Sequence, residues 1–95
     1  MLVLVTYDVN TETPDGRKRL RQVAKACQDY GQRVQNSVFE CVVDSSLLLK
    51  VKDRLVKLID PQKDSLRFYV MGNDKGNVDH YGVKPSFNVT DILIL

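Results

Sequence analysis

The sequence has few of the features on which membrane proteins and metal-thiolate domains depend. No apolar run approaches the roughly 20 residues that an α-helix needs to cross a bilayer, so we expect no membrane span. The apolar start lacks a basic leading segment, and we expect no secretory signal there. The two cysteines, Cys27 and Cys41, lack the tight spacing of a zinc or redox motif. We therefore expect two buried thiols in a reducing cytoplasm.

Catalytic arrangements other than one built on a carboxylate are also scarce. His80 is the only histidine, and it has no partner at catalytic or metal-ligand spacing. A ribonuclease that works with two imidazoles is therefore disfavoured, unless a dimer supplies both, and we expect His80 on the surface. The glycines at positions 72, 76 and 82 form no phosphate-binding loop, and no nucleotide-binding signature is present.

Charge is distributed unevenly along the chain, although the net charge is only +2. Residues 16–33 contain six basic residues and one acid, while the rest of the chain is net negative. A local basic surface attracts a phosphate backbone more strongly than the bulk charge suggests. This distribution favours a nucleic-acid partner.

Hydrophobic periodicity predicts three strands and two helices. We expect strands at Leu2–Val9, Arg33–Val43 and Ser65–Met71. We expect one helix from Asp15 or Arg17 to Tyr30, and a second that has Asp44 and Ser45 as candidate caps and ends at Ile59. Gly31 stands where a left-handed helix cap is expected. Residues 33–43 suit one long strand, although a bend could split them. A polar stretch, residues 72–82, follows the last strand, and the chain ends in an apolar run at residues 92–95.

This order of elements predicts an α+β fold of the ferredoxin-like βαββαβ class, with two helices on one face of an antiparallel sheet. The first strand is apolar on both sides, so both sheet faces need cover. A chain of 95 residues makes one small domain that buries only about two-thirds of its unfolded surface. We therefore expect a homodimer, in which a second copy covers the open face across a two-fold axis.

Three segments occur in an order and spacing that resemble a known family. They are Tyr7-Asp8-Val9 at the end of the first strand, GQRVQNSVFE at residues 31–40 and DSLRFY at residues 64–69. Together they resemble the CRISPR-associated protein 2 family over at least residues 1–71. The KRLR start of the first helix and the GQRVQNSVFE block are most similar to members from type I-C systems.

The resemblance implies a dimer formed through the open sheet face, with the C-terminal strand crossing to the partner. We therefore expect a ferredoxin-like domain at residues 1–82, and at residues 83–95 a linker and strand that pair with the other protomer. Family members are described as metal-dependent nucleases of single-stranded RNA or duplex DNA. They are also described as non-catalytic scaffolds for the CRISPR-associated protein 1 integrase in spacer acquisition. A toxin-type ribonuclease can share the same fold and is a third candidate.

Asp8 is the candidate catalytic and metal-binding residue, because the family's catalytic aspartate matches it. One carboxylate holds a divalent ion poorly, but near a two-fold axis Asp8 occurs twice and could hold one Mg²⁺ or Mn²⁺ between two copies. Functional or dimer-face positions of the family match Arg33, Ser37 and Phe39, and we expect them, with Tyr7, to shape the site. The alternatives are that Asp8 caps the following loop and that Phe39 packs in the core.

Basic residues gather at the start of the first helix. We expect Arg17, Lys18, Arg19, Arg21 and Lys25 to bind the phosphate backbone of nucleic acid. Positive charge near a helix N-terminus opposes the helix dipole, which favours a binding role over the alternative, a merely solvated face. Asn36 stands where family members can carry a further basic residue, which weakens the case for a single-stranded RNA groove.

Overall fold

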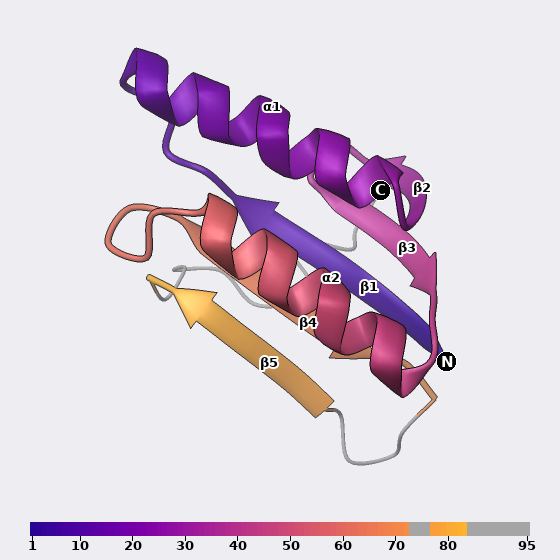
Figure 1. Ribbon diagram of the computed structural model, residues 1–95. Helices are drawn as coiled ribbons and strands as arrows, with labels where there is room; N and C mark the ends of the chain where they lie inside the picture. The colour runs from indigo at the N-terminus through magenta and orange to yellow at the C-terminus, as the bar shows by residue number, and fades with distance from the viewer. Residues whose placement is uncertain (73–76, 84–95) are drawn as a thin grey trace.

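The computed structural model describes residues 1–72 and 77–83, which form one antiparallel sheet and two helices (Figure 1). The elements are β1 (Leu2–Asp8), α1 (Pro14–Gln28), β2 (Gly31–Gln35), β3 (Val38–Val42), α2 (Ser45–Leu58), β4 (Ser65–Val70) and β5 (Asn77–Gly82). The strand order is β2-β3-β1-β4-β5, and every neighbouring pair is antiparallel. The predicted α+β class is confirmed. Within the described residues, neither helix is long and apolar enough to span a bilayer.

Both helices begin at side-chain caps. The Thr13 hydroxyl accepts a hydrogen bond from the Gly16 N–H at 3.1 Å, and Pro14 occupies the first turn of α1. The Asp44 carboxylate accepts from the Leu47 N–H at 2.8 Å at the start of α2, as predicted. Capping removes unsatisfied backbone donors, so both helices start at positions set by their own local sequence.

The two faces of β1 belong to two separate apolar clusters. Val3, Val5 and Tyr7 face α1 and α2 and belong to the main core. Figure 1 shows both helices on this one face of the sheet. On the other face, a smaller cluster consists of Leu4, Val38 and Tyr69. The prediction that β1 is apolar on both sides is therefore confirmed, and we call the face without helices the open face.

Residues 33–43 form a hairpin and not a single strand. A turn at Asn36–Ser37 separates β2 from β3, and the register shifts between Arg33 and Gln35, where Val34 is left exposed. Asn and Ser favour turns because their side chains hydrogen-bond to nearby backbone. Of the two alternatives that the sequence allowed, one long strand or a strand split by a bend, the structure has the second.

The prediction of a left-handed cap at Gly31 is wrong. Among the described residues, positive φ occurs only at Gly72 and Gly82. Gly31 instead begins β2, and a Cβ atom there would lie 2.4 Å from the Glu40 carbonyl oxygen and 2.5 Å from the Cys41 sulfur. Glycine is needed at this position because β2 approaches β3 too closely for a side chain.

The segment predicted as a polar stretch, residues 72–82, contains the fifth strand. β5 pairs with β4 along its whole length at the edge of the sheet. Its Tyr81 packs edge-to-face on Phe68, with ring centroids 6.0 Å apart. The predicted C-terminal strand falls in residues 84–95, which lie outside the described residues, so that expectation stays a prediction.

The two cysteines are buried free thiols, as predicted. Burial, with a smaller contribution from Cys41, raises the pKa of Cys27 to about 12. Burial also raises the pKa of Cys41. Both thiols therefore stay protonated and unreactive at neutral pH.

Candidate active site

A pocket of about 550 Å³ opens on the open face, at the end of β1. Its lining consists of Thr6, Tyr7, Asp8, Gln35, Asn36, Ser37, Val38, Ser65 and Arg67. These residues come from β1, from the β2–β3 turn and from the start of β4. The fold thus brings together parts of all three segments that the sequence singled out.

Asp8 is the exposed last residue of β1. In the described part of the chain, its carboxylate has no hydrogen-bond or ion-pair partner. The loop that follows is held by other groups: the Asn10 side chain accepts from the Glu12 N–H at 2.9 Å, and the Asp64 carboxylate accepts from the Asn10 N–H at 3.0 Å. The alternative that Asp8 caps this loop therefore has no support.

Strand pairing places polar side chains around Asp8. Thr6 lies directly between Val38 of β3 and Arg67 of β4. Asp8 lies opposite Ser65, two residues further along the same face. Side chains directly opposite each other in antiparallel strands have Cβ atoms about 5 Å apart. A carboxylate, hydroxyls and a guanidinium are thus grouped on one small area of sheet.

Tyr7 holds the hairpin turn that forms one wall of the pocket. Its N–H donates to the Ser37 carbonyl at 3.1 Å, and its hydroxyl donates to the Asn36 carbonyl at 3.3 Å. Its ring lies on the helix side of the sheet, stacked on Phe39 with centroids 6.2 Å apart. Burial, and secondarily Cys27, raises the pKa of Tyr7, so its hydroxyl stays a donor at neutral pH.

Two of the predicted site-shaping residues lie across the sheet from Asp8. Phe39 is fully buried in the main core, which is the alternative to a site role that the sequence analysis gave for this residue. The Arg33 guanidinium lies 5.1 Å from the centroid of the Phe39 ring. The structure therefore brings Arg33 and Phe39 to each other, while Ser37 and Tyr7 border the pocket with Asp8.

Comparisons with known proteins identify the family of this chain. Residues 1–77 match the family described as CRISPR associated protein Cas2. The chain belongs to the Cas2 family. It is 62% identical over 95 residues to CRISPR-associated endonuclease Cas2 of Halalkalibacterium halodurans, covering 99% of each chain. It is 57% identical over 96 residues to CRISPR-associated endoribonuclease Cas2 of Chlorobaculum tepidum, covering 100% of each.

The crystal structure of Streptococcus pyogenes Cas2 at pH 6.5 has a similar fold, with a TM-score of 0.71 and 65% sequence identity. The similarity covers 78% of this chain and 89% of that one. A hypothetical protein from Thermus thermophilus is also similar, with a TM-score of 0.62 and 33% identity over 80% of this chain and 93% of that one. The family predicted from the sequence is thus confirmed, and with it the small α+β fold of Cas2 structures.

The five basic residues of α1 that we expected to bind nucleic acid divide into two groups in this Cas2-family chain. Arg17, Lys18, Arg21 and Lys25 are exposed on α1, on the far side of the sheet from the pocket. Arg19 differs, because its side chain is only 16% exposed and is paired with Asp64. Arg19 is therefore committed to a contact within the chain, which the sequence pattern of the helix did not reveal.

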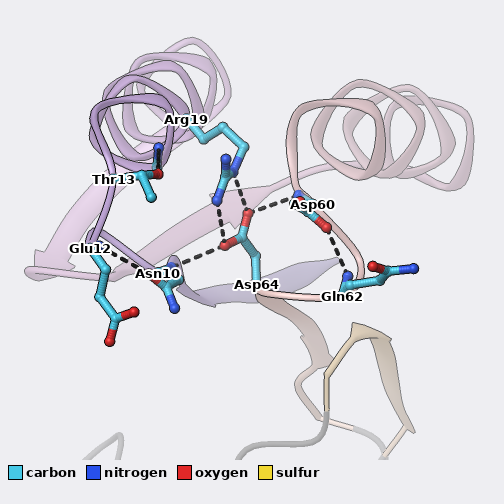
Figure 2. A network of polar contacts seen from close by, with 8 residues as sticks. Asn10, Glu12, Thr13, Arg19, Asp60, Gln62 and Asp64 are labelled. Atoms are coloured by element: carbon cyan, nitrogen blue, oxygen red, sulfur yellow. Dashed lines mark hydrogen bonds and ion pairs between the residues drawn. The ribbon is translucent and has the colours of Figure 1, made fainter.

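Asp64 is the fully buried centre of a polar network beside the site (Figure 2). Its carboxylate accepts from Arg19 Nε at 2.8 Å and Nη2 at 3.3 Å, from the Asp60 N–H at 2.8 Å and from the Asn10 N–H at 3.0 Å. Burial acts to raise the pKa of Asp64, but the hydrogen bonds from Arg19, Asp60 and Asn10 outweigh it, and the pKa lies below its usual value.

This network fixes the strand ends that carry the candidate site. Asp64 directly precedes Ser65, and Asn10 follows Asp8 by two residues. The Asp64 carbonyl also accepts from the Val83 N–H at 2.9 Å, which attaches the end of β5. The loop after β1, the start of α1 and the end of α2 therefore meet at one carboxylate.

His80 extends the polar groups of the pocket towards the sheet edge. It is half-buried on β5, with Nε2 3.3 Å from the Ser65 hydroxyl and 2.8 Å from the Val83 carbonyl oxygen. Because a carbonyl only accepts, Nε2 carries a proton and donates to it. We expected His80 on the surface, but its side chain is half-buried and held by these two contacts.

The donor atoms of the pocket suit a hard divalent cation. The Asp8 carboxylate and the oxygens of Ser37, Ser65 and Asn36 are the ligand type that Mg²⁺ and Mn²⁺ prefer. Among the described residues, however, no three His, Cys, Asp or Glu side chains lie close enough to hold a metal ion. One protomer thus offers a single carboxylate, and the residues fit a metal only if a second copy contributes another.

Proposed function

We propose that this chain is a metal-dependent endonuclease of CRISPR adaptation, active as a homodimer in the cytoplasm. The observation that carries the proposal is the exposed carboxylate of Asp8, which has no partner among residues 1–72 and 77–83 and lies in a pocket on the open face. The names of its relatives, an endonuclease and an endoribonuclease, support a nuclease role. The substrate is a phosphodiester of duplex DNA or single-stranded RNA.

The homodimer follows from the apolar surface beside Asp8. The cluster of Leu4, Val38 and Tyr69 continues into exposed Val42 and Val78, which are 77% and 46% accessible on the same face. A second copy packed on this face, in the ferredoxin-like dimer that we expect, buries that surface and brings two Asp8 carboxylates towards each other.

A bound Mg²⁺ or Mn²⁺ would activate water and offset the negative charge that develops on the phosphoryl group. Asp8 of each protomer would hold the ion. Ser37 and Tyr7 keep the wall of the pocket in place, and Arg33 and Phe39 support that wall from the core side. The exposed basic residues of α1 hold the nucleic-acid backbone; they are Arg17, Lys18, Arg21 and Lys25.

Asp8→Ala tests the nuclease role. We expect cleavage of labelled duplex DNA and single-stranded RNA, with Mg²⁺ or Mn²⁺, to fall at least 100-fold. Light scattering should still find a dimer. Glu12→Gln, an exposed acid in the next loop, is the matched control and should retain activity. Cleavage that survives Asp8→Ala would end the proposal.

The second candidate is a non-catalytic scaffold that binds duplex DNA and bridges the CRISPR-associated protein 1 integrase. The observation that favours it is the exposed basic side of α1, which a dimer joined through the open face would present twice, on outer surfaces. If the chain is a scaffold, the Asp8→Ala variant should still support spacer insertion. Two other variants should not support it: the double variant Arg17→Glu with Arg21→Glu, and a chain that lacks residues 91–95. A neighbouring CRISPR array of type I-C would support either role over a toxin-type ribonuclease.

A further inference from the structure

Arg67 is the one cation in the described lining of the pocket, and the proposed nuclease role does not yet use it. We propose that Arg67 binds the phosphodiester group of the substrate beside Asp8, and that Tyr69 positions the Arg67 guanidinium for this. The proposal rests on the nuclease function proposed above and names the group that recognises its substrate.

Strand register sets the relation of Arg67 to Asp8. Arg67 of β4 lies directly opposite Thr6 of β1, and Asp8 is two residues further along β1 on the same face. Diagonal neighbours of this kind have Cβ atoms about 7 Å apart. Both side chains line the same pocket. This pocket, with a volume of about 550 Å³, has room for a phosphate group that contacts the guanidinium close to the carboxylate.

Tyr69 gives the guanidinium a fixed orientation. Arg67 Nη1 donates to the Tyr69 hydroxyl at 3.0 Å. Tyr69 is only 7% exposed, and its ring packs in the cluster with Leu4 and Val38, so this acceptor is anchored. Arg67 itself is half-buried. A guanidinium held in this way loses little conformational entropy when it binds a phosphate oxygen.

Charge balance gives Arg67 a specific task. Two Asp8 carboxylates would neutralise the charge of one divalent ion, which leaves no excess positive charge for a phosphodiester. The Ser37 and Ser65 hydroxyls in the lining are neutral. Arg67 supplies the positive charge that the substrate needs close to the metal, while the basic residues of α1 lie on the far side of the sheet.

Kinetics of oligonucleotide cleavage test the proposal with Arg67→Ala, Arg67→Lys and Tyr69→Phe. Removal of one preorganised donor to a phosphoryl group costs about 100-fold in rate, so we expect this loss in kcat/KM for Arg67→Ala. Arg67→Lys should recover about tenfold of it. Tyr69→Phe, which keeps the ring in its cluster, should lose about tenfold. Mn²⁺ affinity, measured by electron paramagnetic resonance, and the dimer should be unchanged in all three.

Lys57→Ala removes an exposed cation of α2 and is the matched control, with unchanged kinetics. If Arg67→Ala keeps kcat/KM within threefold while Asp8→Ala is inactive, the role of Arg67 is refuted and the nuclease function stands. If Arg67→Lys and Tyr69→Phe lose Mn²⁺ binding or the dimer, Arg67 is structural, and the proposal is also refuted. If Asp8→Ala is fully active, the nuclease function fails, and the role of Arg67 fails with it.

Discussion

Replacing Asp64 by alanine should lower the free energy of unfolding by about 3 kcal/mol. The substitution removes the acceptor of four hydrogen bonds, two of them from the Arg19 side chain and two from the backbone N–H groups of Asn10 and Asp60. Each backbone donor left without a partner costs about 1–3 kcal/mol. Because Arg19 can turn towards water, the two backbone donors account for most of the loss.

The loss is large for a domain of this size, whose total stability is about 5–14 kcal/mol. Urea denaturation at pH 7 measures it, with all variants at one protein concentration, because association with a second copy adds to apparent stability. The melting temperature should fall by roughly 10–25 °C. Asp53→Ala is the matched control. It also removes a 2.8 Å ion pair, with Lys57, but both of those side chains are more than 60% exposed.

The control should change stability by less than about 0.5 kcal/mol, since solvent screens exposed pairs. If Asp64→Ala costs no more than Asp53→Ala, the buried network does not carry stability and the reasoning is refuted.

Acid titration of stability checks the same network. The folded-state pKa of Asp64 lies below its usual value of 3.8. The unfolded chain therefore binds the proton first as the pH falls, and the contribution of Asp64 is complete above about pH 3.8 and is lost below it, towards the folded-state pKa. Asp64→Asn should lack this part of the acid dependence; an unchanged profile would contradict the assignment.

Three further predictions follow from the contacts described. Gly82→Ala should cost more than about 2 kcal/mol in urea unfolding, because φ is +89° and the new Cβ would lie 2.0 Å from the Asp64 carbonyl oxygen; a neutral change would contradict this. Cys27, with its pKa raised to about 12, should react with a thiol reagent at pH 8 only after unfolding, and rapid labelling of the native protein would refute its burial. Arg17→Glu with Arg21→Glu should weaken duplex DNA binding and reduce the slope of log Kd against log salt by about 2 per protomer, whereas an unchanged slope would exclude phosphate contacts there.

Local sequence signals were sufficient for both helices and for β1 and β4. Capping residues and apolar periodicity act over a few neighbours, so the sequence contains them directly. The β2–β3 hairpin was less visible, because its turn, Asn36–Ser37, lies inside a run of strand-forming residues. β5 was missed because, among the described strands, it lies at the sheet edge and pairs only with β4, and most of its side chains are polar. β5 is a strand because it pairs with β4, and this pairing cannot be predicted from the local sequence of residues 77–82.

The same hairpin explains which of the predicted site residues lie together in the structure. Counting alternation along one continuous strand puts Arg33, Ser37 and Phe39 on one side. The turn and the register shift after Arg33 instead place Arg33 opposite Phe39, away from the pocket, and leave Ser37 in the turn. Asp64 escaped notice for another reason: two of its partners lie 45 and 54 residues away in the chain.

Asp8 and Asp64 lie at neighbouring strand ends, yet their surroundings give them opposite capacities. The oxygens of Asp64 are occupied by donors from its own chain, so it has none to offer a metal ion and serves to hold the loops around it. The oxygens of Asp8 are not satisfied by the described residues and face solvent, next to the apolar cluster of Leu4, Val38 and Tyr69. In the proposed dimer, the charge of Asp8 has to be matched when the apolar surface beside it is covered, and a cation shared by two copies would match it. If this chain forms the dimer proposed above, we therefore expect association and metal binding to be coupled, since each would remove the cost that the other incurs alone.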